Sequence, residues 1–184
     1  MLRKLSLVFA FLAGPAFSTG LEITVAGEAN GMIKIDLWED VAPLHVEQVT
    51  KLAGDGFYDN VYFHRVIEGF MAQTGDGQYA KVGTPDMRRA GYGGSELDNI
   101  PAEFTNEHEF VRGIVGMARG PDENSANSQF FIMFAPYAPL NGKYTIIGEV
   151  TEGLEVLDMI KLGKGGNGAV LGEPDRMVEV RVTE

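Results

Sequence analysis

Apolar and polar residues alternate along several short segments of the chain. Ile33, Ile35 and Leu37 are separated by polar residues, and the same period of two returns over residues 178–182. This period is typical of a strand with one buried face. Many short strands with turn signals between them predict an antiparallel sandwich or barrel. The remaining apolar stretches, each bounded by Gly, Pro, Asn or Asp, are residues 61–67, 70–74, 113–118, 129–134 and 144–150.

Two segments have helical spacing instead. The first follows Pro43 and places Val46, Val49 and Leu52 on one face, with glycines where a helix would end. The second covers residues 152–162 and ends at a glycine. Two helices and about eight strands predict a mainly β fold, a closed eight-stranded antiparallel barrel capped by two α-helices. Closing the sheet in this way removes edges that would otherwise aggregate.

The first residues have the pattern of a secretory signal peptide. A basic start is followed by an apolar run over residues 5–13 and by small residues at the expected cleavage site. The run is shorter than the roughly 20 residues that span a bilayer. We therefore expect residues 1–18 to be a signal peptide and residues 19–184 to form one domain, periplasmic and free of the membrane after cleavage. An uncleaved anchor is the alternative.

Charge and composition narrow the classes of function. The 184 residues include 15 Lys and Arg against 26 Asp and Glu, a formal net charge of -11. A chain this acidic repels phosphate backbones, so we expect no nucleic-acid partner. The chain has no cysteine, which excludes disulfides, thiolate nucleophiles and cysteine-based metal sites.

Other familiar motifs are weak. The three histidines, His45, His64 and His108, share no metal-ligand spacing, so we expect no metal site. Residues 163–168 satisfy G-x-G-x-x-G, but a dinucleotide-binding motif follows a strand and opens a helix, whereas this one follows a predicted helix. The sequence therefore indicates no nucleotide cofactor.

The segment 63–76, Phe-His-Arg-Val-Ile-Glu-Gly-Phe-Met-Ala-Gln-Thr-Gly-Asp, is the most informative one. Read as two strands joined by a Glu-Gly turn, it brings Arg65, Met71 and Gln73 within reach of one another. An arginine among such neighbours can also be a surface residue whose stem covers apolar side chains. Spacing alone leaves both interpretations open.

Two later segments change this balance. Residues 128–132 read Ser-Gln-Phe-Phe-Ile, and residues 140–148 read Leu-Asn-Gly-Lys-Tyr-Thr-Ile-Ile-Gly. In this order, the three segments resemble those of the cyclophilins, with Asn141 in place of the usual Asp. The resemblance implies a peptidyl-prolyl cis-trans isomerase that acts on proline-containing polypeptides and assists the folding of exported proteins. Bond rotation breaks no covalent bond, so it implies no cofactor.

The resemblance also implies roles for particular residues. Arg65 matches the catalytic arginine of the family, and the resemblance implies that Phe70 and Gln73 are catalytic residues as well. The apolar cup for the proline ring corresponds to Phe70, Met71, Phe131 and Leu140. The remaining matches to substrate-binding positions are Ala118, Arg119, Gln129 and Tyr144.

One position departs from the family pattern. Pro139 stands where many members have Trp or Phe directly before the matching leucine, although Tyr137, two positions earlier, could turn in to replace that ring. We therefore expect weak or no cyclosporin binding. A binding module with vestigial activity is the alternative to an enzyme, and a monomer is the default expectation.

Overall fold

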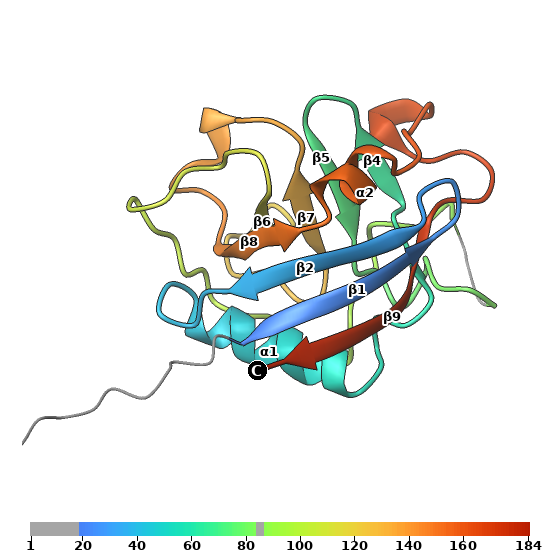
Figure 1. Ribbon diagram of the computed structural model, residues 1–184. Coiled ribbons are helices and arrows are strands. Elements are labelled where there is room, and N and C mark those ends of the chain that lie inside the picture. The colour runs from blue at the N-terminus through green and yellow to red at the C-terminus, as the bar shows by residue number, and fades with distance from the viewer. Residues whose placement is uncertain (1–18, 84–86) are drawn as a thin grey trace, which may run out of the picture.

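A computed structural model of the chain describes residues 19–83 and 87–184. Their strands form one curled antiparallel sheet, and two helices pack against it (Figure 1). Along the sheet the strands follow the order β3-β9-β1-β2-β8-β6-β7-β5-β4. The strands are β1 (Gly20–Ala26), β2 (Gly31–Leu37), β3 (Val61–Tyr62), β4 (Arg65–Ile67), β5 (Met71–Thr74), β6 (Ile114–Met117), β7 (Phe130–Met133), β8 (Ile146–Glu152) and β9 (Arg176–Thr183).

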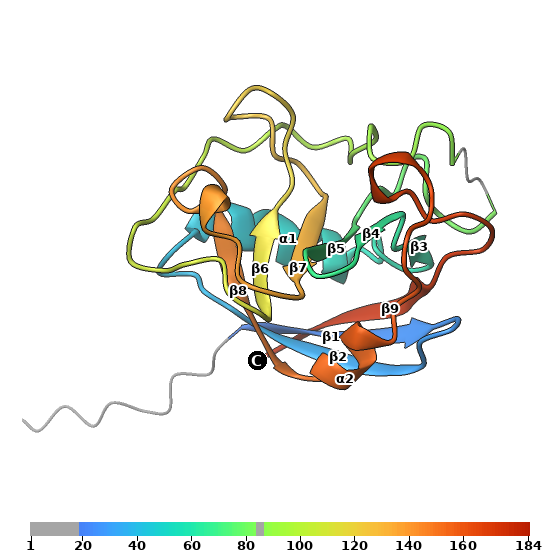
Figure 2. The same ribbon diagram turned by 90° about the horizontal axis from the view of Figure 1, so that it is seen from above.

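The helices are α1 (Pro43–Gly54) and α2 (Leu154–Asp158), accompanied by two short 3-10 turns, η1 (Ala138–Leu140) and η2 (Gly166–Gly168). Strands β6 and β7 cross the direction of β1, β2 and β9, with α1 behind them (Figure 2). The predicted mainly β architecture with two helices is confirmed. Among the described residues, no helix is long and apolar enough to cross a membrane. The predicted signal peptide, residues 1–18, lies outside the described residues.

The prediction of a closed eight-stranded barrel is wrong in detail. The stretch 61–67, expected as one strand, is divided into β3, which pairs with β9, and β4, which pairs with β5. Phe63 and His64 separate them because their backbones bond to other segments: the Phe63 N–H donates to the Asp175 carbonyl, and the His64 carbonyl accepts from Val170. Within the described residues the sheet therefore has nine strands, and its two end strands share no ladder.

Two further elements, a strand and a helix, differ from expectation. The first strand, β1, was not predicted, although its apolar residues alternate with polar ones and pair with both β2 and β9. Helix α2 is five residues long rather than the eleven residues of the predicted range. It ends early because the N–H of Lys161 donates to the Asp175 side chain, at 2.7 Å, instead of to a helical carbonyl.

Helix α1 owes its first turn to a distant carboxylate. Ala42, at the N-cap, has no side chain that can accept a hydrogen bond. Glu103 replaces it and accepts the backbone N–H groups of Leu44 and His45, at 3.1 and 3.0 Å. Such a capping bond satisfies donors that the helix itself leaves free. The buried face of α1, with Val46, Val49 and Leu52, is as predicted.

Apolar residues are buried on both faces of the sheet. The larger cluster fills the inside of the curl and includes Ile23, Val66, Ala72 and Ile132. A smaller cluster lies on the outer face of β5, β6 and β7; its members are Met71, Phe110, Ile114, Phe131, Met133, Leu140 and Ile146. This outer cluster is the floor on which the candidate site is built.

Candidate active site

The register of three strands places the central residues of the site side by side. Arg65 on β4 lies opposite Gln73 on β5, and Gln73 lies opposite Phe131 on β7. Residues that face each other across antiparallel strands point to the same side of the sheet. Arg65, Gln73 and Phe131 therefore form one row on the outer face, and Met71 lies on the same face two residues from Gln73.

A small pocket of about 170 Å³ opens above this row. Its apolar part comes from Phe70, Met71, Phe131 and Leu140, the last of which is positioned by η1. Arg65 and Gln73 supply polar groups at the wall. The remaining lining residues are Ala118, Arg119 and Tyr144. An apolar cup beside one cation suits a small apolar ring attached to a polar backbone.

Gly116 makes room for the floor of the pocket. It lies opposite Phe131, and a Cβ added at this position would be 2.6 Å from atoms of both Phe110 and Phe131. These two rings stack with their centroids 5.7 Å apart. A side chain at position 116 would therefore force the rings away from the strand.

Arg65 is held at several atoms. Its Nη1 donates to Gln73 Oε1 at 3.0 Å, Nε donates to the Asn167 carbonyl at 2.9 Å, and Nη2 donates to Asn167 Oδ1 at 3.1 Å. Gln73 is itself fixed, because its Nε2 donates to Gln129, which in turn donates to the Gly93 carbonyl. Burial lowers the pKa of Arg65, but a guanidinium stays protonated in proteins.

Arg119 and Tyr144 close another side of the pocket. The Arg119 guanidinium carbon lies 4.6 Å from the centre of the Tyr144 ring, and its Nη2 donates to the Lys143 carbonyl at 2.9 Å. The Tyr144 ring meets Phe131 edge to face, with centroids 6.0 Å apart. A cation stacked on an aromatic face gains from the ring quadrupole, so this side is a packed wall.

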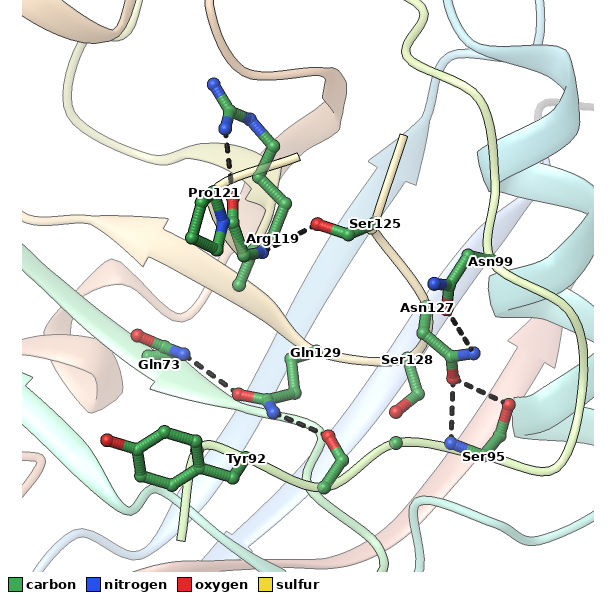
Figure 3. A pocket seen from close by; sticks show the side chains of 15 residues that line it. Gln73, Tyr92, Ser95, Asn99, Arg119, Pro121, Ser125, Asn127, Ser128 and Gln129 are labelled. Carbon is green, nitrogen blue, oxygen red and sulfur yellow. Dashed lines mark hydrogen bonds between the residues drawn. The ribbon is translucent and has the colours of Figure 1, made fainter. Parts of the chain in front are cut away.

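A second, larger hollow of about 580 Å³, lined mainly by polar side chains and glycines, adjoins the pocket and shares Gln73, Ala118 and Arg119 with it. Figure 3 shows the Gln73–Gln129 bond on its floor and Asn127 at the opposite side. Asn127 Oδ1 accepts both the N–H and the hydroxyl of Ser95. These bonds tie the loop before residue 100 to the segment that leads into β7.

At the rim near Pro139, the missing aromatic ring is not replaced from within the pocket. Pro139 is exposed on η1. The Tyr137 ring lies against Phe70, with centroids 4.7 Å apart, and remains 44% exposed. Tyr137 therefore supports Phe70 from outside the pocket and is not among the residues that line it.

The structure brings together the residues that the sequence singled out. All of the predicted site residues line the small pocket except Gln129, which lines the adjoining hollow and contacts the pocket through Gln73. The sequence does not single out Asn167, which follows Arg65 by about a hundred positions and lies in the glycine-rich segment of residues 163–168. Among the described residues, no group of three or more His, Asp or Glu is placed to hold a metal ion.

Comparison with known proteins agrees with this geometry. Residues 21–182 match the family described as cyclophilin type peptidyl-prolyl cis-trans isomerase/CLD. The chain belongs to the cyclophilin family. Solved structures support the assignment. This cyclophilin superposes on a Cryptosporidium parvum cyclophilin-type isomerase, determined in the presence of the dipeptide Ala-Pro, with a TM-score of 0.74 and 25% identity. The superposition covers 90% of this chain and 99% of that one.

Curated relatives carry the same name. The cyclophilin is 46% identical over 154 residues to a Brucella suis protein named "Probable peptidyl-prolyl cis-trans isomerase". The aligned residues cover 83% of this chain and 78% of that protein. It is 37% identical over 139 residues to "Peptidyl-prolyl cis-trans isomerase 10" of Caenorhabditis elegans, over 75% of this chain and 81% of that protein. The cyclophilin is thus a member of an isomerase family over nearly all of its described length.

Proposed function

We propose that this cyclophilin accelerates rotation about Xaa-Pro bonds in exported proteins and thereby assists their folding in the periplasm. The observation that carries the proposal is the pocket in which the Arg65 guanidinium stands beside an apolar cup. Uncatalysed prolyl isomerisation takes tens of seconds and can limit folding. The signal-peptide pattern at residues 1–18 supports export as the setting.

The cup is the anchor for the proline ring. Phe70, Met71, Phe131 and Leu140 offer apolar surface in a volume of about 170 Å³, which suits a pyrrolidine ring. Burying apolar surface stabilises the bound ring. With the ring fixed, the preceding carbonyl group is the part that rotates.

Arg65 lowers the barrier to this rotation. The barrier of about 18–20 kcal/mol comes from amide resonance. In the twisted transition state the proline nitrogen loses conjugation and carries a more localised lone pair, so a fixed donor gains more there than in either planar state. Arg65 contributes such a donor, because Gln73 and Asn167 leave other N–H groups of its guanidinium available for substrate.

The other matched residues bind the rest of the peptide. Gln73 and Gln129 connect the small pocket to the polar hollow, and we assign them contacts with the substrate backbone. Ala118 and Arg119 lie where the two hollows meet, so a peptide with its proline in the cup would pass over them. Tyr144 rims the cup beside Arg119.

A binding module with vestigial activity is the competing function, favoured only by the replacement at Pro139. It predicts that peptides bind without faster exchange. The intact row of Arg65, Gln73 and Phe131 favours the enzyme, since a module that only binds has no need of a held guanidinium.

Exchange NMR on a short Xaa-Pro peptide separates these functions. Catalytic amounts of the purified protein should accelerate cis-trans exchange. Losing one preorganised donor costs about 10² to 10³ in rate, so Arg65→Ala should lower kcat/KM by that factor while the melting temperature is retained. Arg65→Lys, which keeps the charge but loses the planar fork, is the matched control and should recover little activity. Binding without accelerated exchange in the unaltered protein would favour the binding module.

Export needs its own experiment. The full chain, expressed in a bacterial host with its own first 18 residues, should be recovered from the periplasmic fraction. N-terminal sequencing should then find Thr19 as the first residue. Recovery from the cytoplasm with Met1 intact would contradict the proposed setting and leave the isomerase assignment untouched.

A further inference from the structure

The glycine-rich segment of residues 163–170, called here the glycine strap, lies directly against strand β4. The N–H of Gly163 donates to the Val66 carbonyl at 2.9 Å, and the N–H of Val170 donates to the His64 carbonyl at 3.0 Å. These two carbonyls belong to the residues on either side of Arg65. The strap is therefore fastened to the backbone before and after the arginine.

Glycine is required for this close approach. A Cβ at Gly168, whose φ is +77°, would lie 2.3 Å from Ile67 Cγ1, and a Cβ at Gly163 would lie 1.9 Å from the Gly168 carbonyl oxygen. Neither position has space for a side chain. The glycine spacing that resembles a nucleotide-binding motif thus serves the packing of a loop on a strand.

Asn167 is the exception among these glycines. Its φ is +54° and its ψ is 29°, a left-handed conformation that Asn tolerates better than other residues with side chains. In this conformation its carbonyl oxygen and its Oδ1 both accept from the Arg65 guanidinium, at 2.9 and 3.1 Å. One residue thus binds two nitrogens of the arginine.

The guanidinium is held from two sides. Asn167 accepts from Nε and Nη2, and Gln73 accepts from Nη1. A guanidinium has five N–H groups, so two remain without an oxygen partner among the described residues, one on each Nη; the second on Nη1 has only the Met71 sulfur at 3.9 Å. The fork is thus fixed in direction with one donor on each Nη left for a substrate.

We propose that Asn167 is a positioning residue for isomerisation, which aims the Arg65 guanidinium at the prolyl bond. The inference rests on the proposed function, since it requires Arg65 to act on the substrate. A long arginine side chain has considerable rotamer freedom, and preorganisation of a donor is what gives it catalytic value. Asn167 supplies this preorganisation through the strap, and it does so without touching substrate.

Asn167→Gly is the sharpest variant. Glycine adopts the left-handed conformation readily and keeps the backbone carbonyl, so only the Oδ1 acceptor is lost. We expect kcat to fall by about tenfold with little change in KM, the pattern of an interaction used in the transition state. Asn60→Gly is the matched control: Asn60 also has positive φ, +61°. That variant should keep activity within about twofold, because Asn60 is not among the residues that line the pocket.

Two readouts separate positioning from a general structural effect. First, Asn167→Gly should have no further effect in an Arg65→Ala background, because residues that act as a unit are not additive. Second, the Arg65 Nε–H resonance in a proton–nitrogen NMR spectrum should broaden or move toward its free position in Asn167→Gly and stay unchanged in Asn60→Gly.

The outcomes distinguish the two proposals. If Arg65→Ala is inactive while Asn167→Gly keeps full activity, the positioning role is wrong and the proposed function stands. If Asn167→Gly lowers activity equally with and without Arg65, the residue acts by another route and the positioning role is also wrong. If Arg65→Ala retains full activity, the role of Arg65 is wrong and the positioning role falls with it. If the unaltered protein gives no faster exchange, the proposed function itself fails.

Discussion

The two faces of the sheet are both apolar and both buried, yet one forms the interior core and the other forms the floor of the candidate site. On β5 and β7, Ala72 and Ile132 point into the curl and belong to the interior cluster, whereas their neighbours Met71 and Phe131 belong to the outer cluster. The interior is closed by strands and by α1. The outer cluster opens into the pocket beside Arg65. Burial alone therefore does not separate the core from the site; what separates them is whether a polar group stands at the edge of the apolar surface.

The strongest test of this comparison uses adjacent residues of one strand. Ile132 is fully buried inside the curl, and Phe131 is 5% exposed outside it. Ile132→Ala should lower the free energy of unfolding by about 2–5 kcal/mol, the range for large-to-small core substitutions. Its kcat/KM, measured well below the melting temperature, should stay within about threefold of the original, because the pocket is lined from the other face.

Phe131→Ala is the counterpart on the outer face. It should reduce kcat/KM by at least about tenfold, since a lost 1.4 kcal/mol of ring contact gives that factor, in addition to a stability cost. Chemical denaturation and peptide exchange, performed on both variants, check the pair. Equal losses of activity in the two variants would show that the faces are not separable.

His64, the residue directly before Arg65, offers a pH test. It stands between β3 and β4 and is 3% exposed, and burial lowers its pKa to about 4 despite the nearby Asp76 carboxylate. An unfolded histidine titrates near 6.5. Between these two pH values the unfolded state binds a proton that the folded state does not, so the free energy of unfolding falls as the pH drops from 6.5 to 4.

The expected size is about 3 kcal/mol over this window, at 1.36 kcal/mol for each pKa unit. His64→Gln, which cannot titrate, should lose that part of the slope in urea denaturation series at pH 7, 5.5 and 4. His45, also buried, has a lowered pKa and leaves a remaining slope in both proteins. Parallel curves for the two proteins would contradict the assignment to His64.

Much of this arrangement could be predicted from local patterns, and the remainder depends on distant contacts. The hairpin of β4 and β5 put Arg65 near Met71 and Gln73 from the sequence alone. The alternation of apolar and polar residues in β1 is a local pattern of the same kind. In contrast, the early end of α2 depends on Asp175, fourteen positions after Lys161, which no local pattern shows.

The residues of the site, too, divide into those that the sequence identifies and those that only the structure reveals. Strands β6 and β7 are buried at every position, so no alternation in the sequence says which residues line the pocket; the family resemblance supplied Phe131. Asn167 was beyond both kinds of reasoning, because a conformation with positive φ and a partner 102 positions away leave no periodic signal. Contacts between segments far apart in the chain need the structure.

A smaller effect is expected from adding one methyl group beneath the outer cluster. In Gly116→Ala the new Cβ would be 2.6 Å from Phe110 and Phe131, so the rings must move toward the pocket. Overpacking of this kind costs about 1–3 kcal/mol, and the narrowed pocket should raise KM more than it lowers kcat. Gly54→Ala, at the end of α1 with no atom within 4 Å of the new Cβ, is the control and should not destabilise the protein. An unchanged KM in Gly116→Ala would mean that the rings relax away from the pocket.

The smallest effect on the fold belongs to the rim. Pro139 is exposed on η1 beside Leu140, so Pro139→Trp should change the free energy of unfolding by no more than about 0.5 kcal/mol. Its effect on binding should be larger. An added indole gives an apolar ligand such as cyclosporin a further aromatic surface, and each 1.4 kcal/mol gained lowers Kd tenfold. We therefore expect weak cyclosporin inhibition of the unaltered protein and at least about tenfold tighter inhibition of Pro139→Trp. Nanomolar inhibition of the unaltered protein would instead mean that Tyr137, packed on Phe70, already supplies the aromatic surface of the rim.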